Sequence, residues 1–311
     1  MTLMAEGANA KVKTKYIIKK GKTDRLFNWT NISLLFLLLV IMIYPLIYVV
    51  SNSFSGSDAI MSGKVWLWPI DFSFDGYKAV FAYQGIWRAY ANTVFYTVAG
   101  TLIGIIMTLL AACPLSRADL YGRKYIMVFF TFTMFFSGGL IPFYRLVSSL
   151  KLIHTIWSMI IPSAMSVWNV LITKTFLQSS ISNELVDAAK IDGCNDFMVF
   201  RRIVIPLSGA IIAVNAIFYG VGFWNSYFNA YIFLTDQDLY PLQLVLRSIL
   251  VLNKVDLQFM PAAMQDMARK QWFTEIIKYS IIVVSTAPIL VIYPFFQRYF
   301  VKGIMIGSIK G

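Results

Sequence analysis

The residues best suited to binding a solute lie in a charge-free apolar segment from 203 to 235. Polar or small residues recur there at intervals of four, three, four and three, which places them on one face of a helix. Amides and hydroxyls on such a face can bind the hydroxyl groups of a neutral solute, and aromatic rings can pack on its apolar surfaces. The same groups could instead join this helix to a neighbour, and the sequence favours neither role. The members of this face are Asn215, Tyr219, Gly222, Ser226 and Asn229.

Two further candidates lie halfway along another charge-free segment, residues 152–173. Trp168 could pack on the same solute and Asn169 could bind its polar groups, although core packing is the commoner role for such residues. His154, near the start of this segment, is the single histidine of the chain. A lone histidine at a helix start more often caps the helix or fills an interface than forms a site.

The chain offers little for catalysis. One histidine and two cysteines, Cys113 and Cys194, cannot build a multi-histidine or cysteine-rich metal site, and both cysteines are expected to face a reducing compartment. Gly21-Lys22-Thr23 resembles the end of a phosphate-binding loop, but Tyr16 stands where the earlier glycine should be. We therefore expect no metal, cofactor or nucleotide site in this chain.

The elements that position these residues are predicted to be membrane-spanning helices. Of 311 residues, 58% are hydrophobic and 14% charged, and the mean hydropathy of +0.67 does not fit a soluble domain. Six segments without Asp, Glu, Lys or Arg each supply about the 20 apolar residues that a spanning helix needs: 26–57, 89–116, 125–144, 152–173, 203–235 and 279–297. We predict an all-α integral membrane protein with six transmembrane helices over 29–50, 90–115, 124–147, 155–178, 205–234 and 276–299. In the second helix, Gly100 and Gly104 have the spacing that permits close helix contact.

The positions of Lys and Arg predict the orientation. With both termini in the cytoplasm, 17 of the 27 basic residues lie inside, as the positive-inside rule requires. The net charge of +12 is then mostly a topology signal with an attraction to anionic membrane lipid, and nucleic-acid binding is the poorer interpretation. The predicted organisation is a basic cytoplasmic tail over 1–28, a transmembrane domain over 29–300 and a cytoplasmic C-terminal tail over 301–311.

The loop over 180–206 is predicted to fold as helix, sharp turn, helix. Asn183 can cap a first short helix, and acidic residues in its first turns complement the helix dipole. Gly193 can end that helix in a left-handed conformation. Asn195 or Asp196 can cap a second helix that runs toward Pro206. Such a loop has the compact form of a knob that docks into another protein.

This loop also carries a family resemblance. Asp187-Ala188-Ala189, three residues, Gly193, nine residues and Ile203-Val204-Ile205-Pro206 resemble the EAA motif of ABC importer permeases, with Asp in place of Glu and Ile in place of Leu. The local sequence from Glu184 to Gly193 is similar to that of the carbohydrate-uptake branch of this family, the MalG and LplC/YtcP-like group. The resemblance extends over most of the chain and implies a MetI-like permease bundle. Residues 180–206 are called the EAA-like loop below.

The resemblance implies a function and a set of partners. A permease of this family works with a second, similar permease, two ATP-binding subunits that hold ATP and Mg at the cytoplasmic face, and an external sugar-binding protein, in a bacterial plasma membrane. It would not itself be an enzyme. The residues implied to contact the ATPase are Glu184, Asp187, Ala188, Ala189, Asp192, Gly193, Arg201 and Pro206 in the loop, and Lys310 and Gly311 at the C-terminus. The substrate path for an oligosaccharide would then use Asn215, Tyr219, Ser226, Asn229, Trp168 and Asn169.

Three alternatives remain beside this interpretation. A permease of the same architecture could carry a peptide, an amino acid or an anion, but a charged solute should meet charged partners, which the spans lack. A polytopic membrane enzyme should show catalytic His, Cys or acidic pairs inside the spans. An ion-coupled transporter should show an intramembrane acid, and the six segments contain none.

Overall fold

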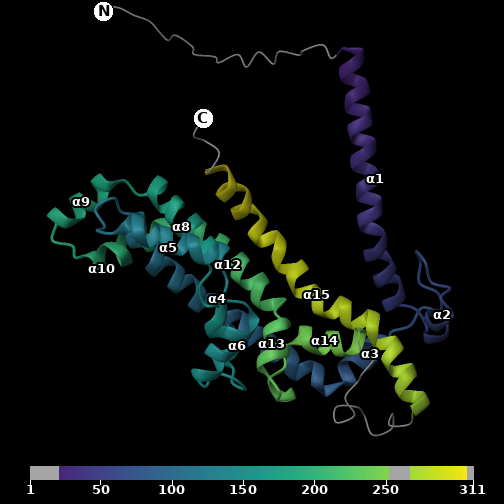
Figure 1. Ribbon diagram of the computed structural model, residues 1–311. Helices are drawn as coiled ribbons and strands as arrows, with labels where there is room; N and C mark the ends of the chain where they lie inside the picture. Colours follow the sequence, from purple (N-terminus) through teal and green to yellow (C-terminus); the bar gives the residue numbers. More distant parts are fainter. Residues whose placement is uncertain (1–20, 252–266, 307–311) are drawn as a thin grey trace, which may run out of the picture. The chain divides into compact units, whose positions relative to one another are not determined.

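The computed structural model describes residues 21–251 and 267–306, and in the last helix it describes the side chains of 274–292 and 294 (Figure 1). The chain forms two units, residues 1–48 and 49–311. Most of the predicted N-terminal tail and the predicted ATPase contacts Lys310 and Gly311 lie outside the described residues.

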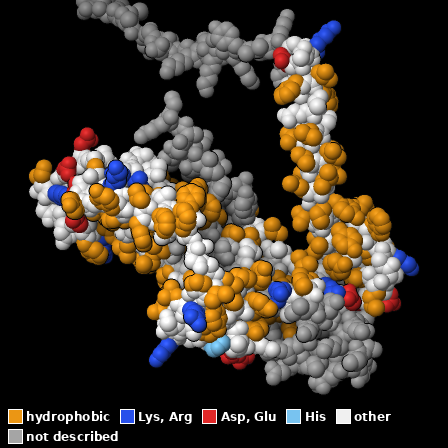
Figure 2. Space-filling view, in the orientation of Figure 1, with side chains coloured by type: hydrophobic (Ala, Val, Ile, Leu, Met, Phe, Trp, Pro, Cys, Tyr) orange, Lys and Arg blue, Asp and Glu red, His pale blue; other side chains and the backbone are white. Residues whose placement is uncertain are grey.

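The first unit contains most of helix α1 (Lys22–Ser53). The helix begins after Gly21, whose backbone N–H donates to Asp24 Oδ2 at 3.1 Å. From Leu34 to Ile47 its side chains are apolar on all sides and exposed, and Figure 2 shows hydrophobic side chains along the visible face of the helix. Such a helix suits contact with lipid or with another apolar partner, because the exposure of apolar side chains around its whole circumference to water is unfavourable. The predicted span 29–50 lies within it.

The second unit is built from helices and irregular segments, and its described residues form no strand. Three of its short turns are the 3₁₀ turns η1 (Ile161–Ser163) and η3 (Gln237–Leu239) and the π turn η2 (Phe200–Val204). The α-helices are α2 (Ser57–Met61), α3 (Asp75–Ala82), α4 (Gln84–Ser116), α5 (Arg123–Phe135), α6 (Leu140–Ser149), α7 (Trp157–Ile160), α8 (Val167–Ser180), α9 (Asn183–Ile191), α10 (Asp196–Val199), α11 (Ile205–Leu207), α12 (Gly209–Trp224), α13 (Phe228–Phe233), α14 (Leu242–Leu250) and α15 (Met267–Ile306).

The prediction of a continuous helix over 124–147 is wrong. The structure has α5 and α6 instead, bent by 115° at a break of four residues. Gly138 and Gly139 lie in this break, and Gly139 has φ +83°, a conformation that a residue with a Cβ rarely adopts. The glycine pair therefore ends one helix and lets the next leave in a new direction.

Two other predicted helices are also broken. Segment 155–178 divides into Trp157–Ser163 and Val167–Ser180, bent by 48°. Segment 205–234 begins in α11, turns by 78° into α12, and ends in the separate α13. Among the described residues, three helices are long and apolar enough to cross a membrane, or up to six segments if each bent pair is one span. The count of six spans and the orientation of the termini remain predictions.

Helix α4 lies at the centre of the second unit, alongside α12 and α8. The glycine spacing in α4 does permit close contact, as predicted. A Cβ added at Gly100 would lie 2.5 Å from the ring of Phe223, and one at Gly104 would lie 3.0 Å from the ring of Tyr219. The two rings of α12 therefore rest directly on the backbone of α4, and this contact positions the residues of the candidate site.

Candidate functional site

A cavity of about 540 Å³, called the α8–α12 cavity below, opens beside the break that precedes α8. Aromatic, amide, hydroxyl and small side chains form its wall, and none of them is charged. Four segments supply this wall: the turn before α8, α8 itself, α12 and the chain that follows α12. The lining residues are Ser163, Met165, Ser166, Trp168, Asn169, Phe218, Tyr219, Gly222, Phe223, Asn225, Ser226, Tyr227, Phe228 and Asn229.

Five of the six predicted path residues line this cavity together, although they come from two distant segments of the sequence. Trp168 has 53% of its surface exposed, whereas Asn169 beside it is buried. Asn229 is half-buried, and its Nδ2 donates to Ser163 Oγ at 3.3 Å. The cavity thus combines an accessible indole ring with amide and hydroxyl groups, a wall that can bind a neutral polar solute.

Asn215 does not line the cavity. It is fully buried, and its Nδ2 donates to Thr173 Oγ1 of α8 at 2.8 Å. Its Oδ1 is buried without a hydrogen-bond partner among the described residues. The geometry therefore favours the alternative role for Asn215, a contact that joins α12 to α8.

The continuous face predicted from Asn215 to Asn229 is also wrong in its second half. Helix α12 ends at Trp224, where Asn225 and Ser226 form a turn. Ser226 and Asn229 line the cavity from the turn after α12 and from α13, and not from the face of α12 that the helical spacing predicted. The Asn225-Ser226 pair is the signal that could have predicted this, since both side chains compete with helical backbone hydrogen bonds.

Tyr219 connects three parts of the cavity wall through its hydroxyl group. The hydroxyl shares a hydrogen bond with Thr108 Oγ1 of α4 at 2.7 Å and accepts one from the backbone N–H of Ser166 at 2.9 Å. Ser166 is the residue before α8, so this bond holds the bend at its first turn. The side chain of Tyr219 is 5% exposed, and its main role is to shape the wall.

Sequence reasoning missed Thr108 and Ser166 as members of this site. Thr108 could have been found, because it follows Gly100 and Gly104 at the same interval of four and shares their face of α4. Ser166 gave no such signal, since its role depends on its backbone N–H and on a bend that is visible only in the structure.

The EAA-like loop folds as helix, turn and helix, as predicted, through α9, α10, η2 and α11. The first cap is not Asn183, which is the first residue of α9. Ser182 caps the helix, and its Oγ accepts the N–H of Leu185 at 3.4 Å. Asn195 caps α10 by accepting the N–H of Met198 at 2.8 Å. Serine fits the first position because its short hydroxyl reaches back to the open helix end.

Gly193 forms the sharp turn between the two helices, with φ +83°. The N–H of Cys194 donates to the carbonyl of Ala189 at 2.9 Å, and the N–H of Gly193 donates to that of Lys190 at 3.0 Å. These two bonds make a Schellman motif, which closes the carbonyl end of α9 and needs a left-handed residue at its centre. The local sequence therefore determines this part of the loop.

The predicted ATPase contacts differ in how the loop presents them. Ala189 is only 8% exposed and packs in an apolar cluster with Leu115 and Leu177 of α4 and α8. The two alanines therefore have different roles. Ala189 anchors the loop to the bundle, whereas Ala188 faces outward. The outward-facing members of the predicted set are Glu184, Asp187, Ala188, Asp192, Gly193, Arg201 and Pro206.

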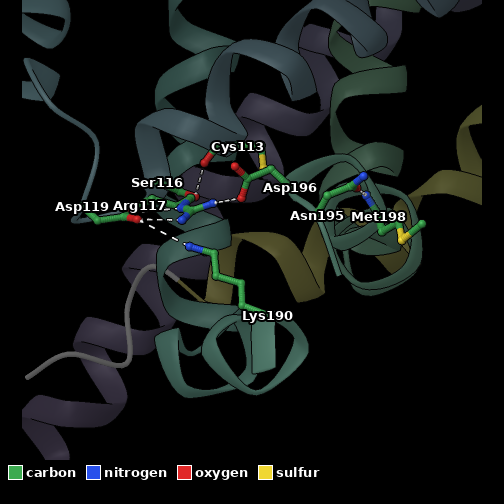
Figure 3. Close-up of polar contacts among 8 residues, drawn as sticks. All are labelled: Cys113, Ser116, Arg117, Asp119, Lys190, Asn195, Asp196 and Met198. Carbon is green, nitrogen blue, oxygen red and sulfur yellow. Dashed lines mark hydrogen bonds and ion pairs between the residues drawn. The ribbon is translucent and has the colours of Figure 1, made fainter. Parts of the chain in front are cut away.

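A group of charged side chains joins the loop to the end of α4 (Figure 3). Arg117 follows α4 directly, and its guanidinium donates to both carboxylate oxygens of Asp119 at 3.0 and 2.6 Å. It also donates to Asp196 of α10 at 2.6 Å. Lys190 of α9 lies 3.9 Å from Asp119. The hydrogen bonds from Arg117 lower the pKa of Asp119 and in turn raise the pKa of the guanidinium. This set is called the Arg117 network below.

The Arg117 network borders a second cavity of about 750 Å³, between the end of α4, α8 and the EAA-like loop. Figure 2 shows both basic and acidic side chains, among hydrophobic ones, over the part of the unit that carries α9 and α10. In the described part of the chain no three His, Cys, Asp or Glu residues come together to hold a metal ion.

The chain is similar to known transport proteins in sequence and in structure. The chain is 39% identical to the polygalacturonan/rhamnogalacturonan transport system permease protein YtcP of Bacillus subtilis, over 93% of this chain and 99% of that protein. It is 38% identical to protein LplC of the same organism, over 93% and 97%. A crystal structure of a bacterial ABC transporter involved in the import of the acidic polysaccharide alginate contains a chain with a TM-score of 0.82 and 32% identity, covering 90% of this chain and 99% of that one.

The matching family model is described as the inner membrane component of binding-protein-dependent transport systems, and it covers residues 85–306, from the start of α4 to the end of α15. The matched segment includes the α8–α12 cavity, the Arg117 network and the EAA-like loop. The chain therefore belongs to the family of binding-protein-dependent transport system inner membrane components, which are ABC importer permeases.

Proposed function

We propose that this chain is the permease subunit of an ATP-driven importer of oligosaccharides. With a second permease it forms the translocation path, and an external binding protein delivers the sugar. ATP and Mg are held by separate ATP-binding subunits, so this chain moves the solute and carries out no chemistry on it. The likeness to YtcP, a permease protein of a polysaccharide transport system, and to a chain of an ABC transporter involved in the import of alginate supports this assignment.

The observation that carries the proposal is the composition of the α8–α12 cavity. Its wall pairs the exposed ring of Trp168 with the amide of Asn229 and the hydroxyl of Ser226, and it contains no charged side chain. Sugar rings have apolar faces for aromatic rings and hydroxyl groups for amides. Phosphate, an amino acid or a small peptide would place its charge against this uncharged wall at a desolvation cost, without the compensating contacts that the rings and hydroxyl groups of a neutral or acidic saccharide can make. The cavity therefore supports a saccharide over the rival solutes.

The EAA-like loop supports the second half of the proposal. Its outward face presents Ala188, Asp187 and the Gly193 turn on a rigid knob. We propose that this face docks on the ATP-binding subunit, and that Lys310 and Gly311 contact the nucleotide-binding dimer. The basic N-terminal tail would then face the cytoplasm and bind anionic lipid in the bacterial plasma membrane.

Uptake by the reconstituted complex tests the substrate. The complex, with its binding protein, is placed in proteoliposomes and supplied with Mg-ATP and one labelled solute at a time. The solutes are an oligogalacturonide, a neutral arabino-oligosaccharide, a tripeptide and phosphate. We expect ATP-dependent uptake of at least one of the two saccharides. Uptake of the peptide or phosphate alone would contradict the proposal.

Two cavity variants test the path. Trp168→Leu and Asn229→Leu should lower saccharide uptake, while the yield of the complex and its basal ATP turnover persist. Trp157→Leu is the matched control, because Trp157 is also exposed, at 46%, but does not line the cavity. Normal uptake by both cavity variants would remove the α8–α12 cavity from the path.

A further inference from the structure

We infer that Arg117 is a positioning residue that connects the EAA-like loop to the α8–α12 cavity through helix α4. The inference rests on the proposed function and deepens it, because it assigns to one side chain the transfer of movement between the docking loop and the substrate path. No such role follows from the EAA motif, which ends at Pro206 and does not include Arg117.

The first step is the geometry of the Arg117 network. The guanidinium binds Asp119 with two parallel hydrogen bonds and Asp196 with a third, at 2.6 Å. Asp119 belongs to the chain after α4, whereas Asp196 begins α10 of the EAA-like loop. A planar guanidinium can hold two carboxylates at fixed angles, which a lysine ammonium cannot do. Arg117 therefore fixes the direction of the loop relative to the end of α4.

The second step is that this contact contributes little to folding. Arg117 has 25% of its side chain exposed, Asp119 has 63% and Asp196 has 76%, so water and salt screen their attraction. The loop is anchored separately by Ala189 and Val199, which pack in the apolar cluster with α4 and α8. With the anchor supplied elsewhere, the remaining role of the network is orientation.

The third step is the connection from Arg117 to the cavity. Thr108 lies in α4, nine residues before Arg117, which directly follows the helix, and this spacing is roughly 14 Å along the helix axis at about 1.5 Å per residue. It binds the hydroxyl of Tyr219, which also accepts the N–H of Ser166 in the cavity wall. Gly100 and Gly104 hold α4 tightly against α12. A displacement of the loop that pulls on Arg117 therefore reaches the wall through one helix.

The experiment uses the whole complex and does not need the natural sugar. In a chain with Cys113→Ala and Cys194→Ala, Ser226→Cys places a thiol in the cavity wall. The probe is a membrane-impermeant thiol reagent added outside proteoliposomes, and the measured quantity is its reaction rate with and without Mg-ATP and vanadate. With Arg117 intact, we expect nucleotide to change this rate roughly fivefold or more, the lower end of typical coupling between sites.

Four variants then test the network. Arg117→Gln and Asp196→Asn should each abolish most of the nucleotide-dependent change, while ATP turnover and assembly persist. The double variant should lose no more of the nucleotide-dependent change than Arg117→Gln does, because both substitutions break the same contact between Arg117 and Asp196. Arg117→Lys keeps the charge but cannot hold both carboxylates, so it should recover only part of the response. Lys124→Gln is the control, since Lys124 is exposed and makes no ion pair with any described residue.

The outcomes separate the inference from the function it rests on. A parent complex without any nucleotide-dependent change at position 226 would overturn the proposed path and the inference together. A parent that responds, with Arg117→Gln and Asp196→Asn responding equally, would overturn only the inference. A complex that dissociates in both variants would assign the network to assembly and overturn the positioning role. If Lys124→Gln lost as much of the nucleotide-dependent change as Arg117→Gln, removing any nearby positive charge would have the same effect. This result would also overturn the inference.

Discussion

Helix α4 (Gln84–Ser116) is held at two places by different chemistry. At its C-terminal end, beside Arg117, partly or fully exposed charged groups from three segments meet in hydrogen bonds and ion pairs. Around Gly100, Gly104 and Thr108, between the middle of the helix and that end, buried uncharged groups meet, and the rings of Tyr219 and Phe223 lie on glycine backbone. Exposed ion pairs add little to stability, whereas close packing resists any change of shape. The comparison implies that stability resides at this buried contact, called the cavity side of α4 below, and orientation at the loop end.

This division predicts two classes of variant. Changes at the cavity side of α4 should destabilise the chain, and their effect on transport should follow from that loss. Changes at the loop end should leave the fold intact and alter how transport follows ATP hydrolysis.

The largest effect is expected where α4 touches α12. Gly100→Ala places a Cβ 2.5 Å from the ring of Phe223, so either the ring or the helix must shift. Overpacking of this kind costs roughly 1–3 kcal/mol. Unfolding of the purified chain by a denaturing detergent should show a lower midpoint. Gly220→Ala is the control, because its Cβ would meet only Thr101 Oγ1 at an ordinary 3.8 Å. Equal midpoints for the two variants would mean that α4 and α12 are not tightly packed.

The next effect is expected at the turn of the EAA-like loop. Gly193 has φ +83°, and a residue with a Cβ pays roughly 1–2 kcal/mol there, more if it is β-branched. Gly193→Val should therefore distort the turn and lower the amount of saccharide moved per ATP hydrolysed by about tenfold, since about 1.4 kcal/mol corresponds to a factor of ten. Uptake and ATP turnover in proteoliposomes measure this ratio.

Gly63→Val provides the matched control for that strain. Gly63 has φ +65° and open space around its Cβ, but it lies after α2, outside the loop. The Gly63→Val variant should lose a similar amount of stability, but it should move as much saccharide per ATP hydrolysed as the parent does. If Gly63→Val also lowered the amount of saccharide moved per ATP hydrolysed, backbone strain at any position, and not specifically in the loop, would reduce coupling.

These same residues show why some features could be predicted from the sequence. Gly193, Asn195 and the glycines of α4 act within a few residues or along one helix, so their spacing in the chain is enough to place them. The breaks after Phe135 and Trp224 were missed because the charge-free segments continue through them, and the absence of charge does not distinguish a bent helix from a straight one. Trp168 and Asn169 were predicted to face the same solute as the residues of the later segment, but the contacts that hold the cavity wall together were not predicted. Tyr219, Ser166 and Thr108 meet only through packing between distant segments.

A smaller effect is expected from the hydroxyl of Tyr219. Tyr219→Phe removes the acceptor of the Ser166 N–H and the partner of Thr108, while Thr108 can turn its hydroxyl to a backbone carbonyl in its own helix. The loss should be about 1 kcal/mol, the usual net value of one hydrogen bond. Thr108→Val should cost about as much, and the double variant less than the sum of the two. Additive midpoints in the same unfolding assay would show that the two hydroxyls do not act together.

The smallest effect concerns pH at the Arg117 network. Because Arg117 lowers the pKa of Asp119, the folded chain keeps this carboxylate ionised more readily than the unfolded chain does. The contribution of Asp119 is then fully present above its unfolded pKa of about 3.9 and is lost only as pH falls through the lower folded value. The difference in thermal midpoint between the parent and Asp119→Asn should therefore be small and constant from pH 8 to pH 5, at roughly 0.15 M salt, where exposed pairs are already screened. Thermal unfolding of the two purified complexes at several pH values measures it. A difference that changes steadily within this range would mean that a group titrating near neutrality controls the network, and the orientation of the loop would then depend on pH in a way that the contacts of Arg117 do not explain.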